Sequence, residues 1–243
     1  MRSLVGLTQV RPDVLVTSQV SGRWSTTRPP LGGLKTKVLF KLCRPPAGHY
    51  WLSGDWQAGE GWLGAVYAQE QRDLQPLYAG IDLHWATACD IFGWFPYDKD
   101  DPRRQQAKTA RFNLQYAYDY RGILDAKDLG IFGGRDAALA FAKRYIDSRP
   151  ALKAAKERVF ADAYRTHEAR SAFGRLRRLT GDERTQSKDG WSQIIQGTIS
   201  NMLNRSIVRI CSELGGKLIF NRHDGAVFQF PCSLYPYDVY EQC

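Results

Sequence analysis

The sequence predicts an α+β fold, in which a small antiparallel sheet accompanies a larger number of helices. The segment HYWLSGDW, residues 49–56, alternates its side chains as a strand does. The segment KLIFNRHDGAVFQFP, residues 217–231, is typical of two strands joined by a tight turn, which we place at Asp224–Gly225. Between them the apolar residues recur at helical spacing. The order of strand, helices and hairpin favours α+β over an alternating βαβ fold.

The first helices are predicted from periodicity and from their start signals. One is expected from Glu60 to Gln71, and another begins after Asp82, whose carboxylate is well placed as its N-cap. A third carries the segment RRQQAKTARFNLQY, residues 103–116, and the glycine-rich segment GIFGGRD follows it as a break.

Two longer helical stretches complete the prediction. Helical spacing covers residues 135–179, with an interruption near Pro150. The last helix stops at Gly215–Gly216. It presents one apolar face, formed by Ile195, Ile199, Met202, Leu203, Ile210 and Leu214.

Composition narrows the class of protein. The chain has 243 residues, of which 43% are hydrophobic and 12% aromatic, so it is long and apolar enough to bury a core. A formal net charge of +9 favours polyanionic partners, nucleic acid above all. No apolar run reaches the roughly 18 residues of a membrane span, so no membrane partner is expected. The five scattered cysteines form no C-x-x-C pair, which argues against a zinc site and favours the cytoplasm.

Within residues 103–116, four side chains recur at intervals of four: Arg104, Lys108, Phe112 and Tyr116. On a helix they form a stripe about 18 Å long, cationic at one end and aromatic at the other. Such a stripe matches a molecule with phosphates at one end and a flat base at the other. The alternative is a solvated basic face beside two core aromatic residues.

Two aspartates end predicted strands and could hold metal ions. Asp55 ends the tryptophan-rich strand, and Asp224 lies at the hairpin turn. Phosphoryl transfer uses oxygen ligands that hold two Mg²⁺ ions about 3.5–4 Å apart, and two aspartates from adjacent strands would supply them. The alternative is structural, because Asp-Gly is itself a strong hairpin signal.

Seven segments in this order resemble the polymerase region of family A DNA polymerases, the bacterial DNA polymerase I type. DWQAGE (55–60) is similar to the family's motif A, RRQQAKTARFNLQY to motif B and HDGAVFQFP (223–231) to motif C. The remaining four are SGRWSTTRPPL (21–31), DLHWATACDIFG (82–93), FGRLRRL (173–179) and IIQGT (194–198). Together they cover nearly the whole chain.

The resemblance implies a role for each matched residue. Asp55 and Asp224 would hold two Mg²⁺ ions, with Mn²⁺ able to substitute, and Lys108 would join them as a catalytic residue. The incoming nucleotide would be bound by His84, Arg104, Lys108, Phe112 and Tyr116, with Glu60 excluding the ribose 2′-hydroxyl and bonding to Tyr116. The primer and template would be contacted by Arg23, Arg175, Gln196 and His223.

The resemblance also implies an organisation and a function. We expect a palm with an antiparallel sheet over residues 1–71 and 166–243, and mostly helical fingers over residues 72–165. The family's thumb and exonuclease-like domains are expected to be absent. The implied activity is template-directed addition of deoxynucleotides to a primer 3′ end, in DNA replication or repair. Its partners are primer–template DNA, dNTPs and a second polypeptide that supplies a thumb or exonuclease.

Two alternatives stay open at this point. One is a single-subunit RNA polymerase-like enzyme, against which Glu60 argues. The other is an inactive fragment or DNA-binding subunit of a split polymerase. The sequence also departs from the family pattern, with Gly225 where an acidic residue usually follows Asp224, Arg111 where asparagine is usual, and Ala117 in place of glycine.

Overall fold

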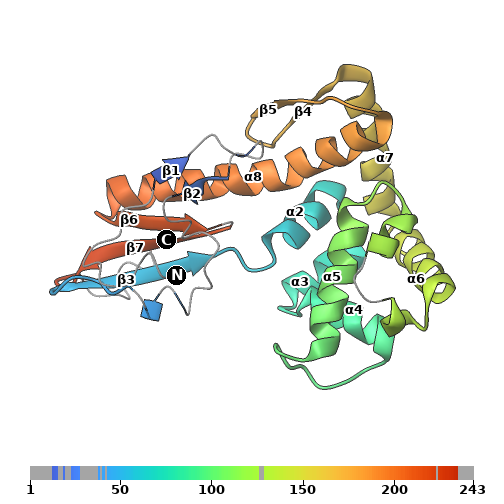
Figure 1. The fold of residues 1–243 in the computed structure, drawn as a ribbon, viewed down its shortest axis with the longest axis horizontal. Helices are drawn as coiled ribbons and strands as arrows, with labels where there is room; N and C mark the ends of the chain where they lie inside the picture. The colour runs from blue at the N-terminus through green and yellow to red at the C-terminus, as the bar shows by residue number, and fades with distance from the viewer. Residues whose placement is uncertain are drawn as a thin grey trace. The chain divides into compact units, whose positions relative to one another are not determined.

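The computed structural model describes residues 13–15, 19, 23–27, 38, 40–41, 43–125, 129–222 and 224–234. It confirms the mixed α+β class, with small antiparallel sheets and many helices (Figure 1). His223 and much of the SGRWSTTRPPL segment lie outside the described residues. Along the described part of the chain, no helix combines the length and the apolar composition that a membrane crossing requires.

The elements follow one another in an order that begins and ends with strands. The strands are β1 (Asp13–Leu15), β2 (Ser25–Thr27), β3 (His49–Asp55), β4 (Glu168–Arg170), β5 (Leu176–Arg178), β6 (Lys217–Arg222) and β7 (Gly225–Pro231). The α-helices are α2 (Gly59–Ala68), α3 (Gln71–Tyr78), α4 (Leu83–Phe92), α5 (Pro102–Tyr116), α6 (Arg135–Asp147), α7 (Pro150–Thr166) and α8 (Glu183–Glu213). Two short 3₁₀ helices are η3 (Tyr120–Asp125) and η4 (Gly130–Phe132).

The chain forms two compact units. The first combines Met1–Gln57 with Gln196–Cys243, and the second is Ala58–Ile195. Helix α8 begins in the second unit and continues into the first. The palm and fingers boundaries proposed from the sequence remain a prediction.

The first unit contains an antiparallel sheet in the order β3–β7–β6. Strand β7 is therefore central, and its residues 225–228 are all buried, as a strand between two neighbours requires. Phe228 and Phe230 pack against Leu203 and Ile207 of α8, which lies along the sheet (Figure 1). The predicted apolar face of this helix is confirmed in part, because Leu203, Ile210 and Leu214 meet the sheet, whereas Ile195 packs with Phe160 of α7.

The hairpin turn differs from its prediction by one residue. Arg222 pairs with Gly225, so Gly225 is the first residue of β7 and Asp224 precedes it in the turn. The prediction of a turn at Asp224–Gly225 is therefore wrong for Gly225, which belongs to the strand. A Cβ atom at position 225 would lie 2.6 Å from the Gly54 carbonyl oxygen, closer than any real contact. Gly225 therefore permits close approach of β7 to β3.

The second unit is helical around two apolar clusters. One contains Leu114 of α5 with Phe141 and Tyr145 of α6, and the other contains Phe160 of α7 with Trp191 of α8. The predicted start of α4 is confirmed, since the Asp82 carboxylate accepts the backbone N–H groups of His84 and Trp85 at 2.8 and 2.9 Å.

Two predicted helices have different bounds. The helix expected to reach Gln71 ends at Ala68, because the Glu70 side chain accepts the Arg72 N–H and starts α3. The helical stretch expected to reach Leu179 breaks before Pro150, as predicted, but α7 then ends at Thr166. The two-stranded sheet β4–β5 follows it. Its chain reversal is permitted by Gly174, which has a φ of 81°.

Candidate active site

The two predicted metal ligands lie at the adjoining ends of two paired strands in the first unit. Asp55 is the last residue of β3 and pairs with Gly225, the residue that follows Asp224. The Trp56 N–H donates to the Asp224 carbonyl oxygen at 3.1 Å, which extends the pairing by one more bond. The strand register therefore brings together two carboxyl residues that are 169 positions apart in the sequence.

This donor set suits a hard divalent cation. The two carboxylates offer oxygen ligands, and Asp55 is exposed while Asp224 is half-buried. Among the described residues, no group of three or more His, Cys, Asp and Glu side chains could enclose a metal ion. Mg²⁺ usually takes one or two carboxylates and completes its shell with water and substrate phosphates. The residues present thus fit an ion that is held together with a nucleotide.

Arg23 lies directly against this pair. Its Nη2 atom donates to Asp224 Oδ1 at 2.5 Å, although the two residues are 201 positions apart. The sequence placed Arg23 near the reacting end of the primer, and the structure places it on a predicted metal ligand. A metal cation at Asp224 would therefore compete with the Arg23 guanidinium for this carboxylate.

Helix α5 has the predicted bounds and stripe. The Asp101 carboxylate caps it by accepting the Arg103 N–H at 2.8 Å, and Pro102 occupies the first turn. Lys108 is exposed, and its ammonium lies 5.8 Å from the centre of the Phe112 ring. Phe112 and Tyr116 are half-buried. This part of the stripe presents one cation and two rings on one face of the helix.

Arg104 differs from the rest of the stripe because it is nearly buried, with 8% of its surface exposed. Its Nη2 atom donates to Asp82 Oδ2 at 2.5 Å, and its Nη1 atom donates to the Lys99 carbonyl oxygen at 3.2 Å. Asp82 therefore caps α4 with one oxygen and holds α5 with the other. In this conformation Arg104 joins two helices.

His84 is packed beside the stripe. Its ring centre is 5.6 Å from that of Phe112. The pKa of His84 is lowered to about 4, chiefly by burial and also by the cations Arg111, Lys108 and Arg104, against the opposing effect of Asp82. The imidazole is therefore neutral at pH 7 and offers a nucleotide one N–H donor without a charge.

Glu60 and Tyr116 form the bond that the sequence predicts. The Tyr116 hydroxyl donates to Glu60 Oε2 at 2.5 Å. Sequence reasoning missed a second contact, in which Gln115 Nε2 donates to the Glu60 carbonyl oxygen at 2.8 Å. Two consecutive residues of α5 thus fix both the side chain and the backbone of Glu60 at the start of α2.

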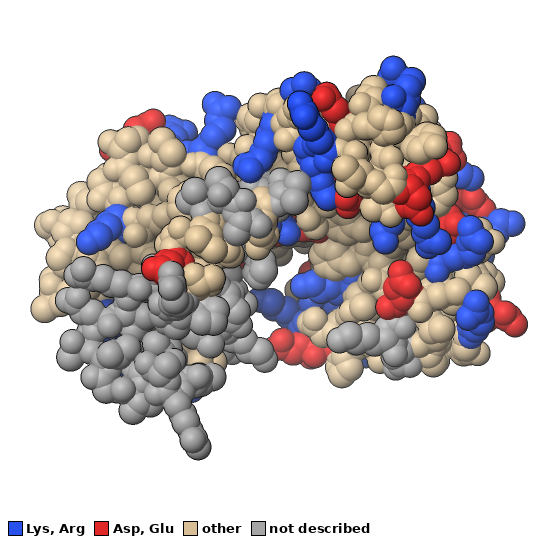
Figure 2. Space-filling view, turned by 45° about the horizontal axis from the view of Figure 1, so that its top comes forward, with Lys and Arg blue, Asp and Glu red and all other residues tan. Residues whose placement is uncertain are grey.

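The basic residues near the β4–β5 hairpin are only in part available to a polyanion. Arg177 is held by Asp189 through an ion pair of 2.5 Å, whereas Arg178 is exposed and Arg175 half-exposed. Figure 2 shows Lys and Arg side chains along the upper part of the view, with Asp and Glu interspersed. Gln196 is half-buried on α8, in the other compact unit, and His223 lies outside the described residues.

Arg111 has a structural role that the sequence did not indicate. It is buried, and its guanidinium donates to Asp73 at 2.9 Å and to the Tyr145 hydroxyl at 2.7 Å. Arg149 donates to the other oxygen of Asp73 at 3.0 Å. The departure from asparagine at position 111 therefore supports the packing of α5 on α3 and α6.

Two aspartates at the adjoining ends of paired strands and a helix with a basic and aromatic face are features of nucleic acid polymerases. The profile of DNA polymerase family A matches residues 5–235 of the chain. The chain belongs to this family. DNA polymerase I of Thermus thermophilus, a thermostable enzyme, is 26% identical over 88% of this chain and 27% of its own length. DNA polymerase I of Pseudomonas aeruginosa is 26% identical over 86% of this chain and 24% of its own length.

A solved structure shares the fold. The POL domain of Pol1 from M. smegmatis, in complex with DNA primer-template and dNTP, matches with a TM-score of 0.81. It is 17% identical, and the match covers 99% of this chain and 45% of that one. The chain thus spans about a quarter of the length of the curated relatives described above and less than half of the solved domain.

Proposed function

We propose that this chain catalyses template-directed DNA synthesis, in which a primer 3′-hydroxyl attacks the α-phosphate of a deoxynucleotide and pyrophosphate leaves. The observation that carries the proposal is the pairing of Asp55 with Gly225, because Asp55 ends β3 and Asp224 directly precedes the neighbouring strand β7. Family membership supports the same activity. The solved neighbour, which was captured with primer-template and dNTP, indicates the kind of partners.

Family A DNA polymerases generally depend on divalent metal ions, and we propose Mg²⁺, with Mn²⁺ as a substitute. Asp55 and Asp224 are the residues that would hold it. When bound there, such ions stabilise the negative charge that develops on the transferred phosphoryl group. A cation held by Asp224 would weaken the attraction between Asp224 and Arg23, and we propose that Arg23 then becomes available to the primer.

The residues of the second unit would bind the nucleotide. Lys108 would contact the triphosphate, and His84 would donate its neutral N–H to the same phosphates. Phe112 and Tyr116 offer ring faces for the base and sugar, and Glu60 would occupy the space of a 2′-hydroxyl. Arg104 would reach the phosphates only by exchanging its bond with Asp82. We propose a cytoplasmic reaction, in keeping with the usage of cysteine.

The bond between Tyr116 and Glu60 favours deoxynucleotides over ribonucleotides, because it holds the carboxylate in one position. This observation argues against the RNA polymerase-like alternative. We further propose that a second polypeptide supplies additional contacts to the DNA. The remaining alternative is that the chain is a DNA-binding subunit without activity, and the following experiment distinguishes it from an active polymerase.

Primer extension with Mg²⁺ by the purified chain tests the proposal. Asp55→Asn and Asp224→Asn should each reduce the rate by about a thousandfold or more, because they remove a ligand of the ions that stabilise the transition state. Glu213→Gln is the matched control, since Glu213 is an exposed acid of the same compact unit. Extension at a near wild-type rate by either aspartate variant would exclude the two-metal assignment. No extension by the wild-type chain would favour the non-catalytic alternative.

A further inference from the structure

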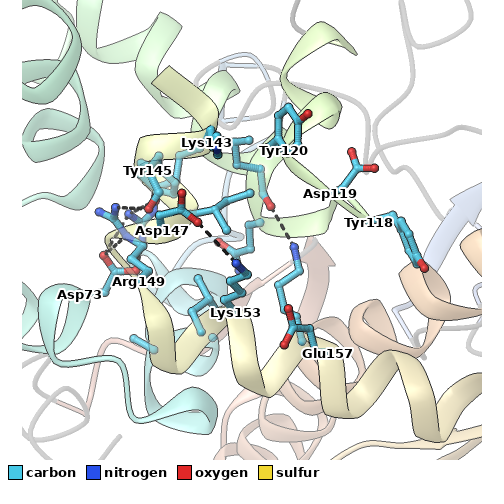
Figure 3. A pocket seen from close by; sticks show the side chains of 18 of the residues that line it. Asp73, Tyr118, Asp119, Tyr120, Lys143, Tyr145, Asp147, Arg149, Lys153 and Glu157 are labelled. Carbon is cyan, nitrogen blue, oxygen red and sulfur yellow. Dashed lines mark hydrogen bonds and ion pairs between the residues drawn. The ribbon is translucent and has the colours of Figure 1, made fainter. Parts of the chain in front are cut away.

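A cavity lies beside α5, where Arg111, Leu114 and Gln115 contribute to its wall. It has a volume of about 380 Å³, within the range of ligand pockets. Its walls come from α2, α3, α5, α6, α7 and the segment after α5, all within the second compact unit. Figure 3 shows Asp73, Tyr145 and Arg149 gathered on one side and Tyr118 and Asp119 on the other.

Two groups in the wall of this cavity carry more positive than negative charge. The first is the cluster of Asp73 with Arg111 and Arg149, in which one carboxylate faces two guanidinium groups at 2.9 and 3.0 Å. All three side chains are at most 5% exposed. This buried cluster therefore has a formal charge of +1.

The second group is the ammonium of Lys156, on α7. It is 7% exposed and donates to the carbonyl oxygens of Leu114 and Ala117 at 3.1 and 2.7 Å. Both acceptors are neutral, although the C-terminal dipole of α5 offsets part of the charge. Among the described residues, no carboxylate forms an ion pair with Lys156. An ammonium has three N–H donors, so two carbonyl groups leave one donor for the cavity that Lys156 lines.

Burial without a counter-ion is costly for a cation. The pKa of Lys156 is lowered to about 8 by its burial, while the Asp119 carboxylate acts on it in the opposite direction. The acids that also line the cavity offset this cost only in part. Asp147 faces Lys153 at 3.5 Å, Asp119 is bound by Arg121 at 2.6 Å, and Glu157 is exposed.

The wall also has an apolar part. Leu114, Ile146, Leu152 and Phe160 contribute side chains to it. A ligand that fills this space must therefore combine an apolar body with a group that offsets buried positive charge.

We infer that this cavity binds a small organic anion, with a flat apolar body between α5, α6 and α7 and one anionic group on the ammonium of Lys156. A carboxylate, sulfonate or phosphate would accept the remaining N–H donor and pair with the charge. The cavity is lined by Gln115, which also holds the Glu60 carbonyl oxygen, but not by Glu60 itself. The test of the site does not depend on polymerase activity.

Two probes of the same shape test the preference for an anion. The probes are 8-anilinonaphthalene-1-sulfonate and the uncharged N-phenyl-1-naphthylamine, titrated into the full chain with fluorescence and calorimetric detection. We expect one site per chain and binding of the sulfonate at least about tenfold tighter, as one charge-assisted contact supplies. Equal affinity for both probes would overturn the inference.

Variants locate the site. Lys156→Gln retains an N–H donor for the α5 carbonyl groups and removes the charge, so it should weaken the sulfonate about tenfold and leave the neutral probe unchanged. Arg158→Met is the matched control, because Arg158 is an exposed cation of the same helix that does not line the cavity. If a folded Lys156→Gln chain lost affinity for both probes to the same extent, the assignment of the anionic group to Lys156 would be contradicted.

Leu152→Trp provides a test that keeps Lys156 intact. It fills the cavity from α7 and should abolish the single site for both probes, while thermal unfolding reports that the chain is folded. Unchanged sulfonate binding in this variant would show that the probe lies elsewhere and would overturn the inference.

Discussion

At the scale of single residues, the position of Glu60 is fixed by two neighbours on α5. Tyr116 holds its carboxylate at 2.5 Å and Gln115 holds its carbonyl oxygen at 2.8 Å. A side chain held in this way can exclude a 2′-hydroxyl, because it cannot move aside without losing a hydrogen bond. Lys108 is exposed and would contribute through charge instead.

We therefore expect Glu60→Ala to raise ribonucleotide incorporation about tenfold or more while deoxynucleotide incorporation changes little. Tyr116→Phe should act in the same direction but less strongly, since it only releases the carboxylate. Lys108→Ala should lower the use of both sugars equally, through lost triphosphate contacts. Single-nucleotide kcat/KM values for matched dNTP and rNTP pairs measure this. An equal effect of Glu60→Ala on both sugars would make Glu60 structural.

His84 gives a prediction for pH. Its pKa is about 4 in the folded chain and 6.5 in the unfolded chain, so between these values the unfolded chain binds a proton that the folded chain does not. The free energy of unfolding should therefore fall as pH falls from about 6.5 to 4, by about 2–3 kcal/mol from this residue.

The measurement is urea unfolding of the wild type and of His84→Gln at pH 8 and at pH 4.5. The variant has no imidazole to protonate. The free energy of unfolding of the wild type minus that of the variant should therefore be smaller at pH 4.5 than at pH 8. A difference between the two chains that does not change with pH would show that His84 titrates normally. The charged groups that act on the ring are Asp82, Arg104, Lys108 and Arg111.

At the scale of elements, the spacing of β3 and β7 depends on one glycine. A Cβ atom on Gly225 would lie 2.6 Å from the Gly54 carbonyl oxygen and 3.2 Å from Cα and Cβ of Asp55. The acidic residue that is usual in the family at this position would therefore not fit between these strands. Their close approach is also what holds Asp55 beside Asp224.

Gly225→Ala should destabilise the chain by about 1–3 kcal/mol, because backbone must move to admit the methyl group. It should also slow primer extension by displacing Asp55. Gly54→Ala is a close control, since a Cβ atom there meets nothing within 4 Å. The free energies of unfolding of the two variants are compared by urea unfolding. Equal stability would mean that the strands separate at no cost and that the spacing is not set by Gly225.

Helix boundaries show where local signals were sufficient. Asp82 and Pro150 act through their own backbone neighbours, and the chain starts α4 and interrupts its helical stretch where these residues predict. The strands β4 and β5 were not predicted, because the spacing of apolar and charged residues in these short segments is compatible with either a hairpin or a helix. Their formation depends on pairing between the two segments, which is a tertiary contact.

At the scale of the whole molecule, many of the cations assigned to nucleic acid are already in ion pairs. Arg23 pairs with Asp224, Arg104 with Asp82 and Arg177 with Asp189, each at 2.5 Å. A polyanion would have to break these pairs or use other cations. The net charge of +9 therefore overstates the number of phosphate contacts that the described residues offer.

We expect the chain alone to bind primer–template weakly, with a log–log salt slope of about −3, as for about three phosphate contacts. Few nucleotides should be added per encounter, and a second polypeptide with further contacts should steepen the slope. Affinity measured between low and moderate salt tests this. Arg178→Ala should reduce the slope by about one, whereas Arg165→Ala, on the exposed surface of α7, should not. A slope of about −6 or steeper with long products would contradict the prediction.

The sequence by itself determined the fold class, the strand that ends at Asp55, the stripe on α5 and the family resemblance that led to the candidate site. Each of these depends on periodicity, on capping or on the order of motifs along the chain, which neighbouring residues encode. Only the tertiary structure decided the contacts of Asp224 with Arg23, of Arg104 with Asp82 and of Lys156 with the end of α5. The reason is physical, because these partners are 22 to 201 residues apart and meet only through packing.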